Sequence, residues 1–329
     1  MTTKSDRARG VLLGLACGDA LGRPMEFNAP SRIQDKHGRV TEMLADGTHR
    51  KPAGTITDDT ALALCIARSL SENGTFDPQA VTDNFIEWYE SDPFDIGGLT
   101  AATLRRLAAG GDWQQVGVEE WSHLPEGRNA GNGSLMRCAP YGLAFHSTLD
   151  DLVAASRVSS AITHADPRCQ WSCVVLNATI AGLLEGHNQP LQLALDIADG
   201  APEEVVDAVT AIKEVVAGDT NPEDVDLMNS GYVVTTLQAG LYHGLTGETA
   251  ENAIIDAVMM GGDTDTIGAV AGAVAGARFG GEALPDRWLD KITEADELKQ
   301  LGRSLADTEF GIVDAAEQLI SENKLDLGE

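Results

Sequence analysis

Apolar residues recur three and four positions apart along most of this chain, which is the spacing of one face of an α-helix. Clear stripes follow Thr57 and occupy the segments 81–88, 153–162, 171–183, 205–216 and 312–320. Alternation with a period of two, which is typical of strands, is scarce. Clusters of Gly, Pro and Asp separate the stripes, and no shift in composition or long linker marks a domain boundary. The pattern predicts an all-α fold, with residues 1–329 forming one domain of a dozen or so helices.

Two of the predicted helices carry glycines at every fourth position. These glycines are Gly10, Gly14, Gly18 and Gly22, and then Gly268, Gly272, Gly276 and Gly280. A glycine inside a helix costs about 1 kcal/mol relative to alanine. Spacing by four places each set on one face of its helix, where another backbone can approach closely. We therefore expect both helices to be central and tightly packed, and each is a candidate partner for the other.

The charge balance narrows the classes of function. The chain has 51 acidic against 23 basic residues, a formal net charge of -28, and 43% of its residues are hydrophobic. Such a surface repels phosphates and anionic lipid, so nucleic-acid and membrane binding are not expected. The five cysteines, an odd number in apolar stretches, favour free thiols in a reducing compartment. The apolar runs 11–17 and 267–277 are too short to span a bilayer. We expect a cytoplasmic protein, with a monomer as the default.

The first candidate site is the segment 54–60, which directly precedes an apolar helix. Asp58 and Asp59 are adjacent there and lie between Thr57 and Thr60. One such side chain is enough to cap a helix, and capping is the simplest role for any one of them. Two adjacent carboxylates flanked by hydroxyls exceed that need, and a cation would relieve their repulsion. The segment is therefore a candidate for a metal site.

A second segment repeats this design before another apolar helix. In residues 261–266, two glycines precede Asp263, Asp265 and Thr266. If the two helix starts face each other, they supply oxygen ligands from both sides. Ligation by oxygen alone favours hard cations such as Mg²⁺ or Mn²⁺ over zinc. The pair of segments predicts a metal centre.

Two further acids lie near the first glycine stripe. Asp19 interrupts the apolar helix, and it can serve either as an acceptor for the end of another helix or as part of a site. Glu26 follows that helix and can act as a general base or as a mobile gate over a site.

Five segments together resemble the ADP-ribosylglycohydrolase family, over residues from about 8 to 285. The segments are Gly18-Asp19-Ala20-Leu21-Gly22 with Glu26, Thr57-Asp58-Asp59-Thr60, Gly131-Asn132-Gly133-Ser134-Leu135-Met136-Arg137, Thr163-His164 and Gly262-Asp263-Thr264-Asp265-Thr266-Ile267-Gly268. The resemblance implies a single compact orthogonal bundle of many helices with two divalent cations, Mg²⁺ or Mn²⁺. The implied metal ligands are Thr57, Asp58, Asp59, Asp263, Asp265 and Thr266.

The resemblance also implies roles in catalysis and substrate binding. The implied catalytic residues are Glu26, Asp95, Asp59 and Asp263. The loop of Gly131, Asn132, Gly133 and Ser134 is expected to bind the diphosphate, as small-residue loops before helices do. His164 and Asp95 are the remaining expected substrate contacts, although a core histidine and a turn-forming aspartate are the simpler roles for them.

The resemblance implies a hydrolase that cleaves the glycosidic bond between ADP-ribose and a modified target. ADP-ribosyl-arginine on a protein is the first expectation, and free ADP-ribose is then the product. Serine, nucleic-acid and small-molecule conjugates are alternatives. Two other classes remain open at this point: a non-catalytic ADP-ribose-binding protein, and a metal-dependent hydrolase that cleaves the diphosphate.

Overall fold

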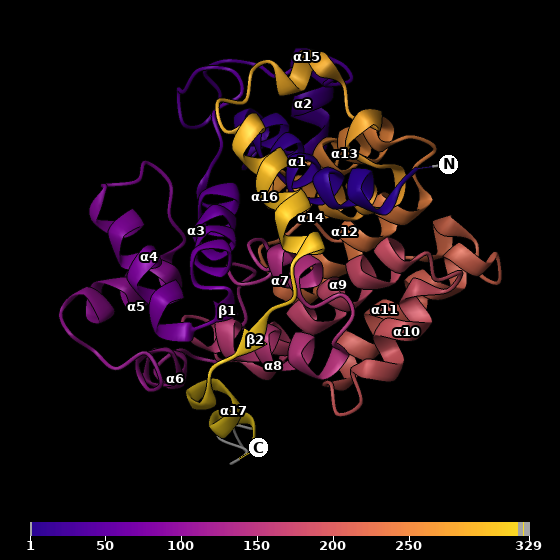
Figure 1. The fold of residues 1–329 in the computed structure, drawn as a ribbon. Helices are drawn as coiled ribbons and strands as arrows, with labels where there is room; N and C mark the ends of the chain where they lie inside the picture. Colours follow the sequence, from indigo (N-terminus) through magenta and orange to yellow (C-terminus); the bar gives the residue numbers. More distant parts are fainter. Residues whose placement is uncertain (1, 322–324, 326–329) are drawn as a thin grey trace.

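The computed structural model describes residues 2–321 and 325, and its elements are almost all helical (Figure 1). The α-helices are α1 (Lys4–Gly22), α2 (Pro30–His37), α3 (Asp58–Asn73), α4 (Pro78–Glu90), α5 (Gly98–Ala108), α6 (Val116–Ser122), α7 (Ala139–Ala144), α8 (Leu149–Ala161), α9 (Pro167–Glu185), α10 (Pro190–Ile197), α11 (Glu203–Ala217), α12 (Val233–Thr246), α13 (Ala250–Met259), α14 (Thr264–Phe279), α15 (Asp286–Leu289), α16 (Ala295–Asp307) and α17 (Asp314–Ser321). The 3-10 helices are η1 (Arg23–Met25), η2 (Pro222–Asp224) and η3 (Gly281–Ala283), and the strands are β1 (Thr75–Phe76) and β2 (Gly311–Ile312). The predicted all-α class is confirmed.

Local signals set the ends of the helices that matter for the site. Thr57 caps α3, and Gly74 ends it in the left-handed conformation with φ of 66°. Asp166 caps α9, and Pro167 occupies its first turn, where the missing N–H has no partner to lose. These are the residues that helix starts and ends favour. The apolar stripes seen in the sequence lie within α3, α4, α9 and α11, and in α8 together with its C-cap residue Ile162.

The two glycine-striped helices, α1 and α14, pack directly on each other at the centre of the molecule (Figure 1). A Cβ atom added at Gly14 would lie 2.1 Å from the carbonyl oxygen of Gly272, and one added at Gly18 would lie 1.8 Å from that of Gly268. Only glycine permits this approach of backbone to backbone. The expectation of two central, tightly packed helices is confirmed, and they are each other's partners.

The stripe predicted over 312–320 is wrong at its beginning. Ile312 lies in β2 and pairs in parallel with Phe76 of β1, whereas the helix starts at Asp314. Two residues are too few to show the alternation that is typical of a strand. The sequence pattern therefore places Ile312 in the helix that follows. Ala316 within α17 is fully buried, as the helical spacing requires.

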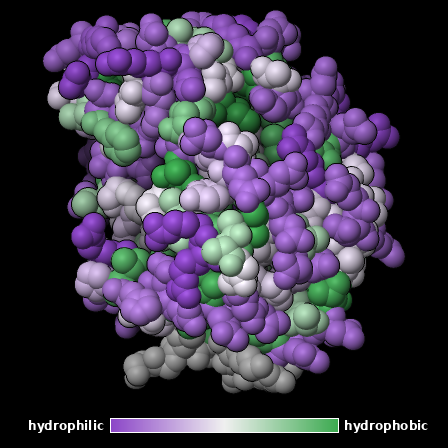
Figure 2. Space-filling model, turned by 90° about the vertical axis from the view of Figure 1, so that its left-hand side faces the viewer, coloured by the Kyte–Doolittle hydropathy of each residue, from purple (hydrophilic) through white to green (hydrophobic). Residues whose placement is uncertain are grey.

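The surface and the cysteines agree with the composition. All five cysteines are free and buried. On the side of the molecule where α4 and α5 lie, the surface is mostly hydrophilic, with apolar residues in small scattered groups (Figure 2). Among the described residues, no helix combines the length and the apolar character needed to cross a bilayer.

Candidate active site

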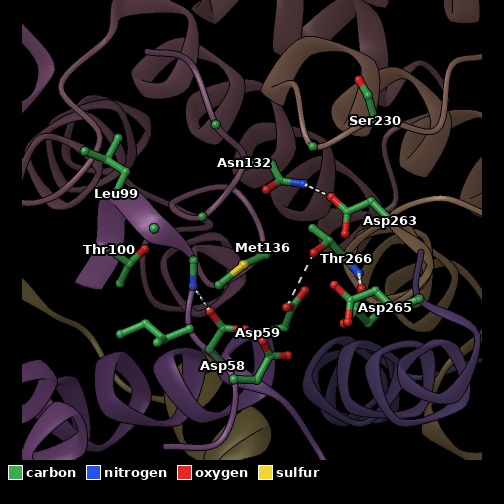
Figure 3. Close-up of a pocket in the computed structure, with 18 of the residues that line it drawn as sticks. Asp58, Asp59, Leu99, Thr100, Asn132, Met136, Ser230, Asp263, Asp265 and Thr266 are labelled. Atoms are coloured by element: carbon green, nitrogen blue, oxygen red, sulfur yellow. Dashed lines mark hydrogen bonds between the residues drawn. The ribbon is translucent and has the colours of Figure 1, made fainter. Parts of the chain in front are cut away.

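Acidic residues from four separate segments line one cavity of about 610 Å³, and one of them is Asp95, which lies between α4 and α5. Asp58 and Asp59 come from the start of α3, Asp263 and Asp265 from the start of α14, and Glu26 from the segment after η1. Figure 3 shows the side chains of both helix starts converging on one another. The structure thus brings together the two acidic clusters, which lie some 200 residues apart in the sequence.

Asp19 fixes the start of α3. Its buried carboxylate accepts hydrogen bonds from the backbone N–H of Thr57, at 3.0 Å, and of Thr60, at 3.2 Å, and from the Thr60 hydroxyl. Asp19 does not line the cavity. Of the two roles open to it, the structure supports the acceptor for the end of another helix. With Asp19 capping the helix, Asp58 and Asp59 are free to face the cavity.

A glycine turn fixes the start of α14. Gly261 and Gly262 both have φ of 70°, a conformation that favours glycine. A Cβ atom at Gly262 would also lie 2.2 Å from the carbonyl oxygen of Asn229. The Gly262 N–H donates to the Asn28 carbonyl at 2.9 Å, and the Phe27 N–H donates to the Gly262 carbonyl at 2.8 Å. These two bonds hold the segment that carries Glu26 over the start of α14.

One hydrogen bond joins the two clusters, and Glu26 lies close to the carboxylates at the start of α14. The Thr266 hydroxyl donates to Asp59 Oδ2 at 3.5 Å, and carboxylate oxygens of Glu26, Asp263 and Asp265 lie within 4.8 Å of one another. Asp59 Oδ1 is buried and has no hydrogen-bond partner among the described residues. An unpartnered buried carboxylate oxygen is costly unless a cation or proton binds it. The donor set of carboxylates and hydroxyls fits Mg²⁺ or Mn²⁺.

Burial and mutual repulsion shift the acidity of these groups in the metal-free protein. Burial, with neighbouring carboxylates such as Asp95 adding to it, raises the pKa of Asp58 to about 8. Burial and the charge of Asp19 raise the pKa of Asp59 well above its usual range, and burial with the charge of Asp59 does the same for Asp265. Each carboxylate is therefore favoured in its protonated form until a cation compensates its charge.

These shifts predict how a cation changes thermal stability with pH. An acid whose pKa is raised on folding stabilises the fold at low pH, and this contribution is lost as pH rises through the raised pKa. For Asp58 that window runs from its usual value of 3.8 up to about 8. Cation binding needs ionised carboxylates, so it becomes tighter over the same window. We expect the difference in Tm between Mn²⁺-loaded and chelated protein to grow steadily from about pH 5.5 to about pH 8.

Differential scanning fluorimetry at constant ionic strength measures this difference. An equal Tm difference at both ends of the pH range would contradict a carboxylate cation site. The Asp77→Ala variant is a suitable control, because Asp77 caps α4 outside the cavity and should leave the pH dependence unchanged.

Glu26 and Asp95 are linked by a histidine that the sequence did not single out. His49 Nε2 lies 2.5 Å from Glu26 Oε2 and 3.6 Å from Asp95 Oδ2. Glu26 is buried, and this burial raises its pKa to about 7 despite the hydrogen bond from His49. Burial also raises the pKa of Asp95. His49 thus forms a hydrogen bond with Glu26 and a longer charge contact with Asp95 beside the acidic clusters.

The loop expected to bind diphosphate lines the cavity only in part. Gly131, Asn132 and Gly133 line it, whereas the Ser134 hydroxyl is buried and accepts a hydrogen bond from Ser160 at 2.9 Å. The Asn132 side chain donates to Asp263 Oδ2 at 2.7 Å, so it orients a carboxylate. Thr57 is likewise absent from the cavity wall, because its hydroxyl accepts from the Asp59 N–H as the cap of α3.

His164 lines the cavity next to this loop. A Cβ atom at Gly133 would lie 2.8 Å from the ring, so glycine lets the loop and the imidazole meet. Burial lowers the pKa of His164 to about 3, and the ring is therefore neutral near pH 7. Its Nδ1 lies 2.8 Å from the Thr163 hydroxyl. A neutral ring in this place can donate or accept a hydrogen bond but brings no charge.

Several lining residues were missed by sequence reasoning. They include Gly98, Leu99, Thr100, Asn229, Ser230 and Gly231, together with His49 beside the cavity. The run 229–231 is a small polar stretch before a helix, a signal like that of the loop at 131–134. His49 stands in an irregular segment without periodicity, and no local signal marks it.

Comparisons with known proteins agree with this fold. A family model described as ADP-ribosylglycohydrolase matches residues 1–314. The chain is 33% identical over 287 residues to an ADP-ribosyl-dinitrogen reductase glycohydrolase of Rhodospirillum rubrum, covering 87% of this chain and 90% of the relative. It is 31% identical over 310 residues to an ADP-ribosylarginine hydrolase of Pseudomonas putida, covering 92% of this chain and 78% of the relative.

A solved structure titled ADP-ribosylglycohydrolase-related protein complex superposes with a TM-score of 0.76 at 33% identity, covering 93% of this chain and 99% of that one. The chain belongs to the ADP-ribosylglycohydrolase family. It is accordingly a hydrolase of glycosidic bonds to ADP-ribose. The resemblance seen in the five sequence segments is thereby confirmed.

Proposed function

We propose that this chain uses two divalent cations, Mg²⁺ or Mn²⁺, to release ADP-ribose from ADP-ribosylated arginine on proteins. The observation that carries the proposal is the convergence of the acidic starts of α3 and α14 in one cavity. The arginine linkage is favoured because a relative of 31% identity is named for that activity. The proposed ligands are the carboxylates and hydroxyls of Asp58, Asp59, Asp263, Asp265 and Thr266, which line the cavity, and of Thr57, whose hydroxyl lies behind the wall and donates to Asp59 Oδ2 at 3.2 Å.

The cations would supply positive charge that offsets the negative charge of the carboxylates. They would also orient ribose hydroxyls and lower the pKa of water. The start of α3 positions Asp58 and Asp59. The Asn132 amide orients Asp263 through a hydrogen bond. The Gly131–Gly133 backbone and the neutral ring of His164 are available to the diphosphate and to the distal part of the ligand. The chain's own contribution is a set of oxygen atoms fixed before substrate arrives.

Glu26 is the best candidate for moving a proton. Cleavage of the bond at the anomeric carbon passes through an oxocarbenium-like state and needs a proton for the leaving group. A carboxyl with a pKa of about 7 is able both to take and to give a proton near neutral pH. His49 contacts the Glu26 carboxylate. Asp95, which lies on the other side of His49, is the second candidate for proton transfer.

Hydrolysis of ADP-ribosyl-arginine, with products identified by mass, tests the proposal. We expect intact ADP-ribose and free arginine with Mg²⁺ or Mn²⁺, and turnover reduced at least about 100-fold with a chelator, as the loss of a catalytic cation implies. Serine-linked ADP-ribose, run in parallel, tests the choice of linkage.

Two outcomes would contradict the proposal. Release of AMP and ribose phosphate would place cleavage at the diphosphate. Tight binding of free ADP-ribose without any turnover, in the presence of either cation, would instead indicate a binding protein.

A further inference from the structure

The mouth of the cavity carries an unusual share of the exposed apolar side chains. Among the described residues, the large hydrophobic side chains that are exposed are Phe27 at 74%, Met228 at 51%, Val216 at 48% and Phe94 at 40%. Phe27 lines the cavity, while Phe94 and Met228 directly precede the lining residues Asp95 and Asn229. Three of the four thus belong to segments that line the cavity. Exposed aromatic side chains grouped in this way are typical of surfaces that contact another protein.

The exposure of Phe27 is built into the backbone. Phe27 has φ of 63°, a left-handed conformation that a bulky residue rarely adopts. The hydrogen bonds from its N–H to Gly262 and from Gly262 to Asn28 hold the segment in this conformation. The ring is therefore presented to solvent at the rim of the cavity. Strain kept at an opening points to a contact with a ligand or partner.

A second hollow, of about 400 Å³, lies on the other side of the same segment. Met25 and Asn28 line this hollow, whereas Glu26 and Phe27 line the cavity, so the segment is a shared wall. The loop behind it is tied to that wall, because the Thr48 hydroxyl donates to the Glu26 carbonyl at 2.7 Å. The hollow and the cavity therefore adjoin each other across this segment.

The second hollow is basic in a strongly acidic chain. Arg32 and Lys36 from α2 and Arg50 from the following loop line it, and Asp46 is the one carboxylate among the described residues of its wall. None of the three forms an ion pair within the described part of the chain, whereas the nearby Arg39 pairs with Asp256 at 2.6 Å. Free positive charge at one place on a chain of net charge -28 attracts an anionic partner.

We propose that Phe27, Phe94 and Met228, together with Arg32, Lys36 and Arg50, form a docking face for the ADP-ribosylated protein, whose surface around the modified residue is acidic. The inference rests on the proposed function and adds the chemistry of the target. The modified side chain enters the cavity past the aromatic rim, and acidic residues beside it meet the basic hollow. The rest of the acidic surface repels the same target, which favours this one orientation.

Two peptides that carry ADP-ribosyl-arginine test the proposal, one flanked by aspartate and glutamate and the other by lysine. We expect the wild-type protein to hydrolyse the acidic peptide with a kcat/KM about tenfold above that of the basic peptide at low salt. This ratio should fall as the salt concentration rises, because salt screens the charges. In the Arg32→Glu/Lys36→Glu variant, we expect the ratio to fall to about one or below. Free ADP-ribosyl-arginine, which has no flanking residues, is the reference for each variant.

A matched control separates this effect from net charge. Arg105 and Lys299 are also exposed and without ion pairs in the described chain, and they line neither hollow. The Arg105→Glu/Lys299→Glu variant makes the same change in charge and should keep the wild-type ratio. A wild-type ratio near one, or a preference that survives in Arg32→Glu/Lys36→Glu, would overturn the docking face.

Failure of the proposed function gives a different result. In that case the wild-type protein hydrolyses neither peptide nor free ADP-ribosyl-arginine. Fluorescence anisotropy measures the preference as a difference in binding affinity without turnover. It uses fluorescently labelled forms of the same two peptides and the Asp263→Asn variant. A preference for the acidic peptide there supports the docking face by itself, and equal binding of both peptides overturns it.

Discussion

Replacing Asp263 with asparagine is expected to lower kcat/KM for ADP-ribosyl-arginine at least about 1,000-fold, equivalent to about 4 kcal/mol of transition-state stabilisation. Asparagine keeps the size of the side chain and can still accept the hydrogen bond from Asn132, which is 2.7 Å long in the native protein. Only the negative charge that would hold a cation is lost. Steady-state kinetics with saturating Mn²⁺ measure the effect, and Asp58→Asn should behave in the same way.

The same substitution should stabilise the chelated protein. Burial raises the pKa of Asp263, so the ionised carboxylate is unfavourable in the fold without a cation. Removing the charge is therefore expected to raise the Tm of the chelated protein at about pH 8, where ionisation is most complete. Loss of activity with a gain of stability is what a functional carboxylate shows, since function and not folding keeps it there.

Asp77→Ala is the control for loss of an aspartate at the start of a helix, because Asp77 stands at the N-cap position of α4 as Asp263 does at that of α14, and only the Asp77 side chain makes capping hydrogen bonds. Loss of this cap should cost about 1 kcal/mol of unfolding free energy and leave kcat/KM unchanged. Cation-dependent turnover retained in Asp263→Asn would exclude this carboxylate from the proposed metal centre.

The acidic clusters could be found from the sequence because each breaks a local rule. One residue caps a helix, and segments 57–60 and 263–266 hold more acids and hydroxyls than capping uses. The glycine stripes were visible for the same reason, since glycine weakens a helix unless a close neighbour requires it. Each signal is an excess of one kind of residue over what the helix itself requires. In the structure they coincide, because Gly22 of α1 packs against Thr264 at the start of α14.

Side-chain directions in irregular segments were not predictable in this way. Asp19 stands in an apolar helix, and only the fold shows that it caps α3. Ser134 belongs to a segment that resembles a phosphate loop, yet its hydroxyl bonds to Ser160 in the core. His49 belongs to no periodic pattern of residues. Its contact with Glu26 depends on the path of the loop formed by residues 38–57. Such contacts are set by tertiary structure, which a single sequence does not encode as a pattern.

The second large effect is expected from Gly14→Ala, with a loss of about 3 kcal/mol or more in unfolding free energy from overpacking. Helix propensity alone predicts the opposite, a gain of about 1 kcal/mol. The added Cβ atom would lie 2.1 Å from the Gly272 carbonyl oxygen, so α1 and α14 must move apart. Because the clash is with backbone, no rotamer change relieves it. Urea unfolding measures the free energy, and the expected fall in Tm is about 4 °C for a chain of this length.

Gly98→Ala is the matched control for the steric argument. Gly98 begins α5, and a Cβ atom added there would meet nothing within 4 Å. This variant should be as stable as the wild type or slightly more stable, because alanine is the better helix former. Equal stability of Gly14→Ala and Gly98→Ala would mean that the two central helices do not pack as described.

Gly14→Ala should also weaken cation binding, because α1 positions both acidic clusters. Asp19 on α1 holds the start of α3, and Gly22 on the same helix packs against the start of α14. Separating α1 from α14 therefore changes the distance between the carboxylates of α3 and those of α14. Affinity for Mn²⁺, measured by calorimetry on folded protein, is expected to fall about tenfold or more, as it does when groups that orient metal ligands are disturbed. An unchanged affinity would separate the packing of the core from the geometry of the site.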